Sequence, residues 1–208
     1  MIIAVANPKG GVGKSTQALN TAVYLGINTV IDLDMATKTL TTLCAIRSGS
    51  NPEFNIDCHS FDTLEEFTSF YNSFDGDMVI DCGGHDSDLT RVGISVADIV
   101  ITPTTTTSND LAGLIALNKM LSEIDAVSYV FPCRVHHQKQ NFKELFISKE
   151  KLELNNITFL SSKVSELSQT SKAVDCGLSV LEFDKYCQSH REQLALAREI
   201  ETIFNKLD

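Results

Sequence analysis

The feature that most constrains this chain is a glycine-rich loop between an apolar run and a helix-compatible run. The loop reads Asn-Pro-Lys-Gly-Gly-Val-Gly-Lys-Ser-Thr over residues 7–16, after the apolar run 2–6 and before the run 16–25. Glycines at a strand-to-helix junction let backbone N–H groups close around an anion, and the helix N-terminus adds partial positive charge. Lys14 supplies a full charge, and Ser15 can offer its hydroxyl to Mg²⁺. The loop therefore predicts a phosphate site.

A glycine-rich turn after a strand can also be only a tight turn. Here strand, three glycines, two lysines, Ser-Thr and helix follow one another in the order that a phosphate site needs. The usual pattern G-x-x-x-x-G-K-[ST] fails by one residue, because Pro8 stands where its first glycine should be, and a second lysine, Lys9, follows it. We predict that this variant loop binds a nucleotide.

A second motif indicates a magnesium ion beside the phosphates. An apolar strand ends in Asp81, and Gly83 and Gly84 follow. Such a carboxylate can hold Mg²⁺, usually through water, while the glycines let the backbone approach the γ-phosphate. Strands that end in aspartate are common, so this pattern alone is weak evidence for a metal site. It becomes strong evidence because the same sequence contains the phosphate loop. We predict that Asp81 and Ser15 lie at the metal, and that the glycines begin a switch segment that runs to Asp88.

Strands and helices alternate along nearly the whole chain. Further strands are predicted at 28–34, 55–60, 97–103, 127–134 and 157–160, and further helices at 39–47, 63–74, 110–124, 141–154, 164–172 and 188–207. This alternation predicts an α/β fold, with a mostly parallel sheet flanked by helices on both faces and the ligand at the carboxyl ends of the strands. We expect one domain over 1–208. Because the phosphate loop begins at residue 7, we expect no N-terminal helix-turn-helix domain.

Composition restricts the partners and the compartment. The formal charge of −10 argues against a nucleic-acid partner, but residues 134–208 are balanced, with 11 basic and 11 acidic side chains. The six cysteines show no C-x-x-C spacing, so neither a zinc site nor a disulfide framework is indicated. No apolar run reaches the ~18 residues of a membrane span, and the first residues lack the basic flank of a signal peptide. We expect a cytoplasmic protein.

The loop K-G-G-x-G-K-[ST] resembles the deviant Walker A box of the ParA/MinD family of P-loop ATPases, and the Asn-Pro before it is more like the ParA branch. The resemblance implies ATP and Mg²⁺ as cofactors and an ATP-dependent homodimer. It also implies that Lys9 crosses the dimer interface to the phosphates of the second copy, while Lys14 holds those of its own. The residues expected to bind nucleotide are Lys9, Gly10, Gly11, Val12, Gly13, Lys14, Ser15, Thr16 and Arg134.

Two of these expectations concern later strands. Asp32-Leu33-Asp34 matches the start of the family segment D-x-D-P-Q, whose second aspartate positions the attacking water in switch I. Asp34 is then the catalytic carboxylate and Asp32 has a structural or metal-side part. Met35-Ala36 departs from the family pattern, and the alternative is that both aspartates are strand-end residues in water. Arg134 ends a strand where the relatives place residues that face the adenine.

The resemblance implies a short partition ATPase. ATP would close the homodimer, the dimer would bind DNA non-specifically at the nucleoid, and a centromere-binding, ParB-like partner would stimulate hydrolysis. The last third of the chain is basic relative to the rest, so DNA binding is expected there. Dimerisation would double its basic patch and so strengthen binding to a polyanion. The candidates are Lys149, Lys151, Lys163 and Lys172. The alternative is that these lysines only solvate helix faces.

Two other classes within the wider family make different demands. A membrane-surface regulator resembling MinD needs a basic amphipathic C-terminal helix, but charges are nearly balanced from Gln188 onward, so no membrane partner is expected. A redox carrier resembling the nitrogenase iron protein needs paired cysteines at the dimer axis, and the surroundings of Cys82 and Cys133 do not match. An ATPase that positions a protein or membrane-surface cargo remains the alternative function.

Overall fold

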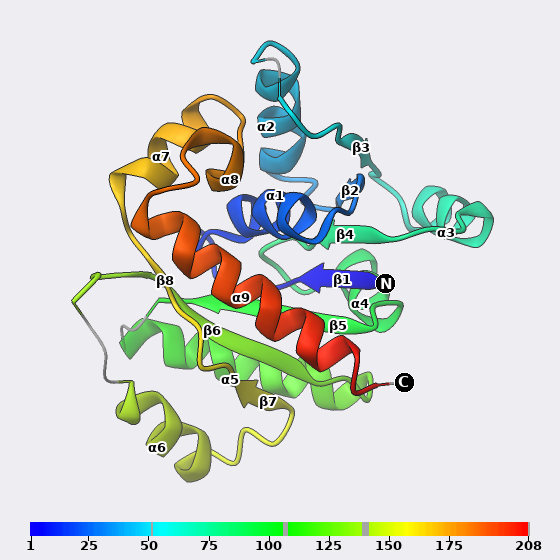
Figure 1. Cartoon of the computed structure of the whole chain (residues 1–208). Coiled ribbons are helices and arrows are strands. Elements are labelled where there is room, and N and C mark those ends of the chain that lie inside the picture. Colours follow the sequence, from blue (N-terminus) through cyan, green and yellow to red (C-terminus); the bar gives the residue numbers. More distant parts are fainter. Residues whose placement is uncertain (51, 106–107, 139–141, 208) are drawn as a thin grey trace.

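The computed structural model describes residues 1–50, 52–105, 108–138 and 142–207. Over these residues it contains an eight-stranded parallel sheet between two layers of helices (Figure 1). The strands run in the order β3-β2-β4-β1-β5-β6-β7, and β8 pairs with β6. Their bounds are β1 Ile2–Val5, β2 Thr29–Asp32, β3 Asp57–Ser60, β4 Met78–Asp81, β5 Ile99–Thr104, β6 Ser128–Val135, β7 Ile157–Phe159 and β8 Val164–Ser165. The predicted fold class is confirmed.

Helices cover both faces of this sheet (Figure 1). One layer consists of α1 Lys14–Leu25, α2 Thr39–Ser48, α7 Ser168–Asp175, α8 Val180–Phe183 and α9 Gln188–Phe204. The other consists of α3 Leu64–Ser73, α4 Asp88–Ser95, α5 Ser108–Glu123 and α6 Lys143–Lys151. None of the helices in the described ranges combines the length and the apolar character needed to cross a bilayer.

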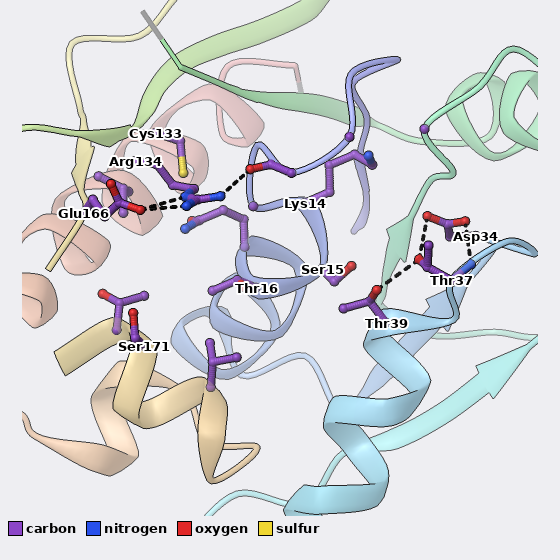
Figure 2. Close-up of a pocket in the computed structure, with 18 of the residues that line it drawn as sticks. Lys14, Ser15, Thr16, Asp34, Thr37, Thr39, Cys133, Arg134, Glu166 and Ser171 are labelled. Atoms are coloured by element: carbon purple, nitrogen blue, oxygen red, sulfur yellow. Dashed lines mark hydrogen bonds and ion pairs between the residues drawn. The ribbon is translucent and has the colours of Figure 1, made fainter. Parts of the chain in front are cut away.

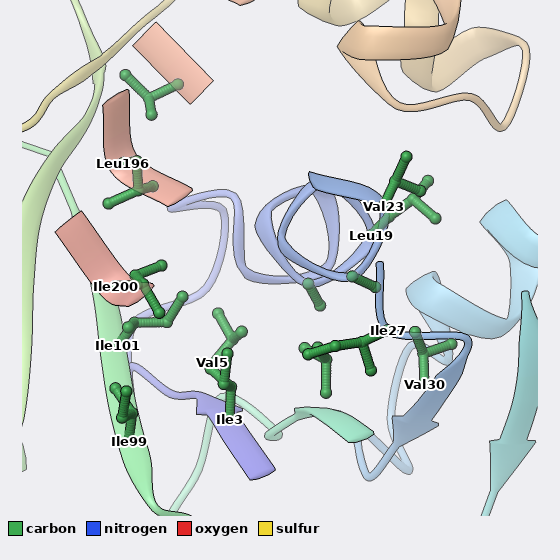
Figure 3. Close-up of a cluster of buried hydrophobic side chains, with 14 of the residues drawn as sticks. Ile3, Val5, Leu19, Val23, Ile27, Val30, Ile99, Ile101, Leu196 and Ile200 are labelled. Carbon is green, nitrogen blue, oxygen red and sulfur yellow. The ribbon is translucent and has the colours of Figure 1, made fainter. Parts of the chain in front are cut away.

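The central strand β1 is buried on both sides. Ile3 and Val5 face a cluster that contains Leu19 of α1 and Ile200 of α9 (Figure 3), whereas Ala4 faces the cluster beneath α3, α4 and α5. This alternation is the two-residue period of a strand, and apolar residues on both faces are typical of a parallel sheet with two helical layers. The apolar face of α9 is therefore covered by α1 and the sheet. The phosphate loop follows directly from this fixed strand.

Three elements differ from the expected pattern. Residues 164–165 form β8, and α7 begins only at Ser168, although a helix was predicted from 164. Glu192 of α9 explains the strand, because its carboxylate accepts from the Ser165 N–H at 2.6 Å and from the Ser165 hydroxyl at 2.9 Å. The predicted switch segment is followed at once by α4, which Ser87 caps by accepting from the Thr90 N–H. The short helix α8 was not predicted either.

A buried ion pair joins α2 to α8. The Arg47 guanidinium donates to both carboxylate oxygens of Glu182, at 2.7 and 2.5 Å, and both side chains are 3% exposed. Burial alone would raise the pKa of Glu182, but hydrogen bonds from Arg47 and Ser179 lower it below the ordinary value. Gly177 lies against Arg47, where an added Cβ would sit 2.4 Å from the Arg47 backbone nitrogen. Close backbone contact and an ion pair together fix the turn before α8 onto α2.

We predict that Arg47→Met lowers the free energy of unfolding by about 3–5 kcal/mol, because it leaves the Glu182 charge buried without a counter-charge. Adding Glu182→Gln should recover part of that loss, since the uncompensated charge is then removed. Urea unfolding of the wild type and both variants measures the effect. A double variant that is no more stable than Arg47→Met would show that lost packing, not the charge, causes the loss.

Candidate nucleotide-binding site

The loop after β1 has the backbone shape of an anion cradle. Gly11 and Gly13 have φ values of 74° and 98°, a left-handed conformation that glycine adopts without strain. Gly13 precedes α1, and no side chain caps that helix end. The first N–H groups of α1 are thus left to a ligand or solvent, as an anion site requires. A Cβ at Gly13 would lie in ordinary van der Waals contact with the Cys133 sulfur, at 3.4 Å, so the backbone conformation and not space favours glycine there.

A buried asparagine holds the start of this loop. The Asn7 amide donates to the Pro103 carbonyl at 2.8 Å, and its Oδ1 accepts from the Lys9 N–H, also at 2.8 Å. The first contact ties the loop to the end of β5, and the second fixes the loop backbone. In the sequence, Asn7 served only as a mark of resemblance to one branch of a family. Its structural role is to anchor the cradle to the sheet.

Lys14 lies inside the site rather than on the surface. Lys14 is only 8% exposed, and its Nζ donates to the Lys9 carbonyl at 3.3 Å. A Cβ at Gly84 would lie 3.5 Å from Nζ, so Lys14 stands between the loop and the segment after β4. This arrangement places a full positive charge where the phosphate loop and the predicted switch segment meet.

Asp81 is the most unusual charge in the site. It is fully buried, and neither carboxylate oxygen makes a hydrogen bond of good geometry with any described residue. Burial raises the pKa of Asp81 to about 7, and the nearby Ser15 hydroxyl and Lys14 charge oppose that rise only in part. A buried carboxylate without a partner is costly unless a cation neutralises it. Asp81 and Ser15 therefore fit a hard divalent cation such as Mg²⁺, whose preferred ligands are oxygens.

The aspartates after β2 have separate contacts. Asp32 is buried and accepts from the Asp34 N–H at 3.0 Å and from the N–H and hydroxyl of Thr41, both at 2.9 Å. Asp34 lines the cavity, and its oxygens accept from the N–H groups of Ala36 and Thr37 and from the Thr37 hydroxyl. Asp32 thus holds the beginning of α2, while Asp34 closes a turn over residues 34–37. A water-orienting role for Asp34 stays a prediction.

Arg134 closes the other side of the loop (Figure 2). Its guanidinium donates to the Gly11 carbonyl at 2.6 Å and to Glu166 at 2.7 and 3.2 Å. Its φ of 54° is uncommon for a residue other than glycine. Arg134 therefore links the phosphate loop to the segment after β8. Whether a base lies against it stays a prediction.

These elements surround a cavity of about 680 Å³, large enough for a nucleotide. The predicted nucleotide-binding residues that line it are Gly10, Gly11, Gly13, Lys14, Ser15, Thr16 and Arg134. Lys9 is not among the described lining residues, and Val12 is buried beneath the loop. Gly84 also lines the cavity, whereas Gly83 packs against the segment after β2.

The wall opposite the phosphate loop was not predicted. It consists of Val164, Ser165 and Glu166 of β8 and the residue after it, and of Thr170, Ser171, Val174 and Asp175 of α7. The sequence predicts a helix over 164–172, and no alternation of apolar and polar residues there indicates a strand that enters the site. Other lining residues that were not predicted include His85, Thr37 and Thr39.

The four lysines suggested for DNA binding lie on separate elements. Lys149 and Lys151 are in α6, Lys172 is in α7, and Lys163 lies between β7 and β8, where its Nζ donates to the His137 carbonyl at 2.7 Å. In Figure 1, α6 and α7 stand at opposite ends of the molecule. A DNA-binding role for these lysines stays a prediction.

Comparison with known proteins places the chain in a family. The family described as the CobQ/CobB/MinD/ParA nucleotide binding domain matches residues 3–180. The chain belongs to this family. This match confirms the ParA/MinD resemblance of the phosphate loop. The members of this family are nucleotide-binding ATPases.

Solved structures of ParA/MinD proteins share the fold over their whole length. The MinC:MinD cell division complex of Aquifex aeolicus matches with a TM-score of 0.73 and 14% identity, over 97% of this chain and 95% of that one. A putative plasmid partition protein of Borrelia burgdorferi B31 bound to AMPPNP matches with 0.65 and 20%, over 100% and 99%. Apo McdA of Cyanothece matches with 0.69 and 15%, over 95% and 98%. None of the curated proteins compared with the sequence matches it.

The raised pKa of Asp81 gives a pH prediction for the metal-free protein. The unfolded carboxyl loses its proton near pH 4, but the folded one keeps it until about pH 7. The folded state therefore becomes less stable as pH rises between these values, by up to about 4 kcal/mol from this group. Asp81→Asn should remove that loss and raise the melting temperature at about pH 8 in a chelator.

The same experiment tests the metal site. Mg²⁺ should stabilise the wild type at about pH 8 and leave Asp81→Asn unchanged, since the variant has no charge to neutralise. Calorimetric melting with and without Mg²⁺ measures both effects. If the variant melts below the wild type in chelator at that pH, or if both respond equally to Mg²⁺, Asp81 does not hold the cation.

Proposed function

We propose that this protein is a partition ATPase. In this proposal ATP and Mg²⁺ close a homodimer, the dimer binds DNA non-specifically, and a centromere-binding, ParB-like partner stimulates hydrolysis to release it. The protein would thereby segregate plasmid or chromosomal DNA while associated with the nucleoid. The family supports the ATPase class, and the arrangement of the two lysines supports the dimer.

The observation that carries the proposal is the separation of Lys9 from Lys14. Lys14 lines the nucleotide cavity, whereas Lys9 lies on the α5 side of the loop, with its Cβ 3.6 Å from where a Cβ of Gly113 would be. The Lys9 backbone is fixed from both sides, because its N–H donates to Asn7 and its carbonyl accepts from Lys14. A lysine so placed is suited to the phosphates of a second copy rather than to its own.

The residues of this chain then divide the work. Lys14 and the loop N–H groups hold the phosphates, and Ser15 and Asp81 hold Mg²⁺, which neutralises phosphate charge when bound. Lys9 of the second copy neutralises negative charge that develops in phosphoryl transfer, as an arginine finger does. Asp34 orients the attacking water. Because Asp34 is now bonded to residues 36–37, this step requires the turn over 34–37 to open.

A second candidate is an ATPase that positions a protein cargo. The four candidate DNA-binding lysines favour this function, because they lie on α6, on α7 and between β7 and β8 rather than on one helix. The protein as a whole is acidic, which also disfavours DNA. Such a protein would use the same nucleotide-dependent dimer but bind a macromolecule other than DNA. DNA retention distinguishes the two functions.

The two lysines should fail in different ways. Lys14→Ala removes a charge-assisted contact to the phosphates and should weaken ATP binding by about 100-fold, or about 3 kcal/mol. Lys9→Ala should leave ATP affinity within about threefold but abolish turnover, because it acts on the other copy. Calorimetry gives the affinities and phosphate release gives the rates. Lys119→Ala, an exposed lysine of α5, is the control.

Loss of ATP affinity in Lys9→Ala to the same extent as in Lys14→Ala would place both lysines at one set of phosphates. Normal turnover in Lys9→Ala would also remove the role across the dimer. Either result would leave the family assignment intact but overturn the proposed dimer mechanism.

DNA co-sedimentation with ATP, with ADP and without nucleotide tests the partition function. Retention should require ATP and fall steeply with salt, because each phosphate contact releases counterions. Lys163→Glu with Lys172→Glu should reduce retention by about tenfold and leave DNA-independent hydrolysis intact. Lys185→Glu with Lys206→Glu gives the same charge change on exposed positions near and beyond the ends of α9. No retention with ATP at low salt would favour the protein-cargo function.

A further inference from the structure

The net negative charge of this protein arises in one stretch of the sequence. Residues 48–90 contain ten aspartates and glutamates and no lysine or arginine, so this stretch accounts for the whole formal charge of −10. It runs from the end of α2 through β3, α3 and β4 to the start of α4. In Figure 1, β3 and α3 stand at one edge of the sheet, far from α6 and α7. Asp57, Asp62, Glu65 and Glu66 lie in or between β3 and α3, so this edge carries part of that net negative charge.

An open groove of about 740 Å³ lies at this edge. Its lining includes Ser60, Phe61, Asp62, Glu65, Glu66 and Phe70. The three carboxylates are exposed, whereas the two phenylalanine rings are half-buried, with centroids 5.2 Å apart. Glutamates in the first turn of α3 also stabilise that helix.

Beside the groove lie a row of neighbouring aromatic rings and the outer edge of β3. The His59 ring lies 4.7 Å from that of Phe70, which lies 5.2 Å from that of Phe74. Among the described strands, β3 pairs with β2 alone. Its Asp57 and Phe61 N–H groups donate toward β2. The N–H groups of the residues that alternate with Asp57 and Phe61 point away from β2. An extended segment of another chain can lie on that side.

One basic side chain already reaches into this groove. Lys38 Nζ lies 2.7 Å from Asp62 Oδ1, and both side chains are substantially exposed, so the pair is weak and can exchange with another cation. Lys38 also ends the turn that Asp34 closes, since its N–H donates to the Asp34 carbonyl at 2.9 Å. Its φ of 46° is left-handed. The groove and the predicted switch turn are thus connected through one ion pair.

We propose that this groove binds a basic segment of another protein that carries an apolar anchor residue. The carboxylates attract the cations, and the anchor packs on Phe61 and Phe70. A cation of the segment replaces Lys38 at Asp62 and releases the turn over 34–38. The acidic field repels nucleic acids and anionic membranes from this edge. Binding is independent of the proposed function, whereas the effect on the switch turn rests on it.

Fluorescence anisotropy with a short labelled peptide of alternating lysine and leucine tests the binding. Glu65→Lys with Glu66→Lys should weaken binding by about tenfold or more relative to the wild type. Glu150→Lys with Glu201→Lys makes the same net-charge change at exposed positions of α6 and α9 and should change the affinity by less than about twofold. Circular dichroism checks that both variants fold.

A peptide of alternating lysine and serine should bind more weakly to the wild type, because it lacks an apolar anchor. If both double variants weaken binding equally, the peptide is attracted only by the net charge of the protein. That result would overturn the proposed binding site. Equal affinity of the leucine and serine peptides would overturn the role of the aromatic wall.

Hydrogen exchange of residues 35–38 tests the link to the switch turn. The leucine peptide should raise their exchange rate by about threefold or more in the wild type. In Asp62→Asn the exchange should already be fast without peptide and should not change when peptide binds. Peptide binding with unchanged exchange in the wild type would overturn the link, and would do so whether or not the protein hydrolyses ATP.

Discussion

The site depends on a fully buried carboxylate whose oxygens make no hydrogen bond of good geometry within the described part of the chain. Asp81 ends β4 beside the phosphate loop, where burial raises its pKa to about 7. The folded chain tolerates this cost because Lys14 stands nearby and because a cation can complete the site. The charge that destabilises the metal-free site is thus the same charge that a divalent cation would neutralise.

The cavity is held from both ends of the chain. Asn7 ties the phosphate loop to β5, and Glu192 of α9 fixes β8 on the opposite wall. Glu199 of the same helix accepts from the N–H groups of Ser161 and Ser162, just before β8. The apolar face of α9 packs on the sheet, while its carboxylates position the segment that lines the cavity. The C-terminal helix therefore supports the site without lining it.

The parts of the site that could be predicted from sequence are local. The order of strand, glycines, lysine and helix fixes the phosphate loop, and Asp81 follows from its place at a strand end. The wall made by β8 and α7 could not be predicted, because Ser165 becomes a strand residue through a contact with Glu192, 27 positions away. Arg134 was reached only through the family resemblance, since no local pattern predicts its bond to Gly11.

In the proposed mechanism, a magnesium nucleotide with a γ-phosphate switches this protein between two assembly states. Light scattering of the unmodified protein with Mg²⁺ and a non-hydrolysable ATP analogue, with Mg²⁺ and ADP, and with chelator alone measures this most directly. The account predicts a mass near twice the 22.8 kDa of the chain with the analogue only, and the chain mass in the other two conditions. The same mass in all three conditions would contradict it.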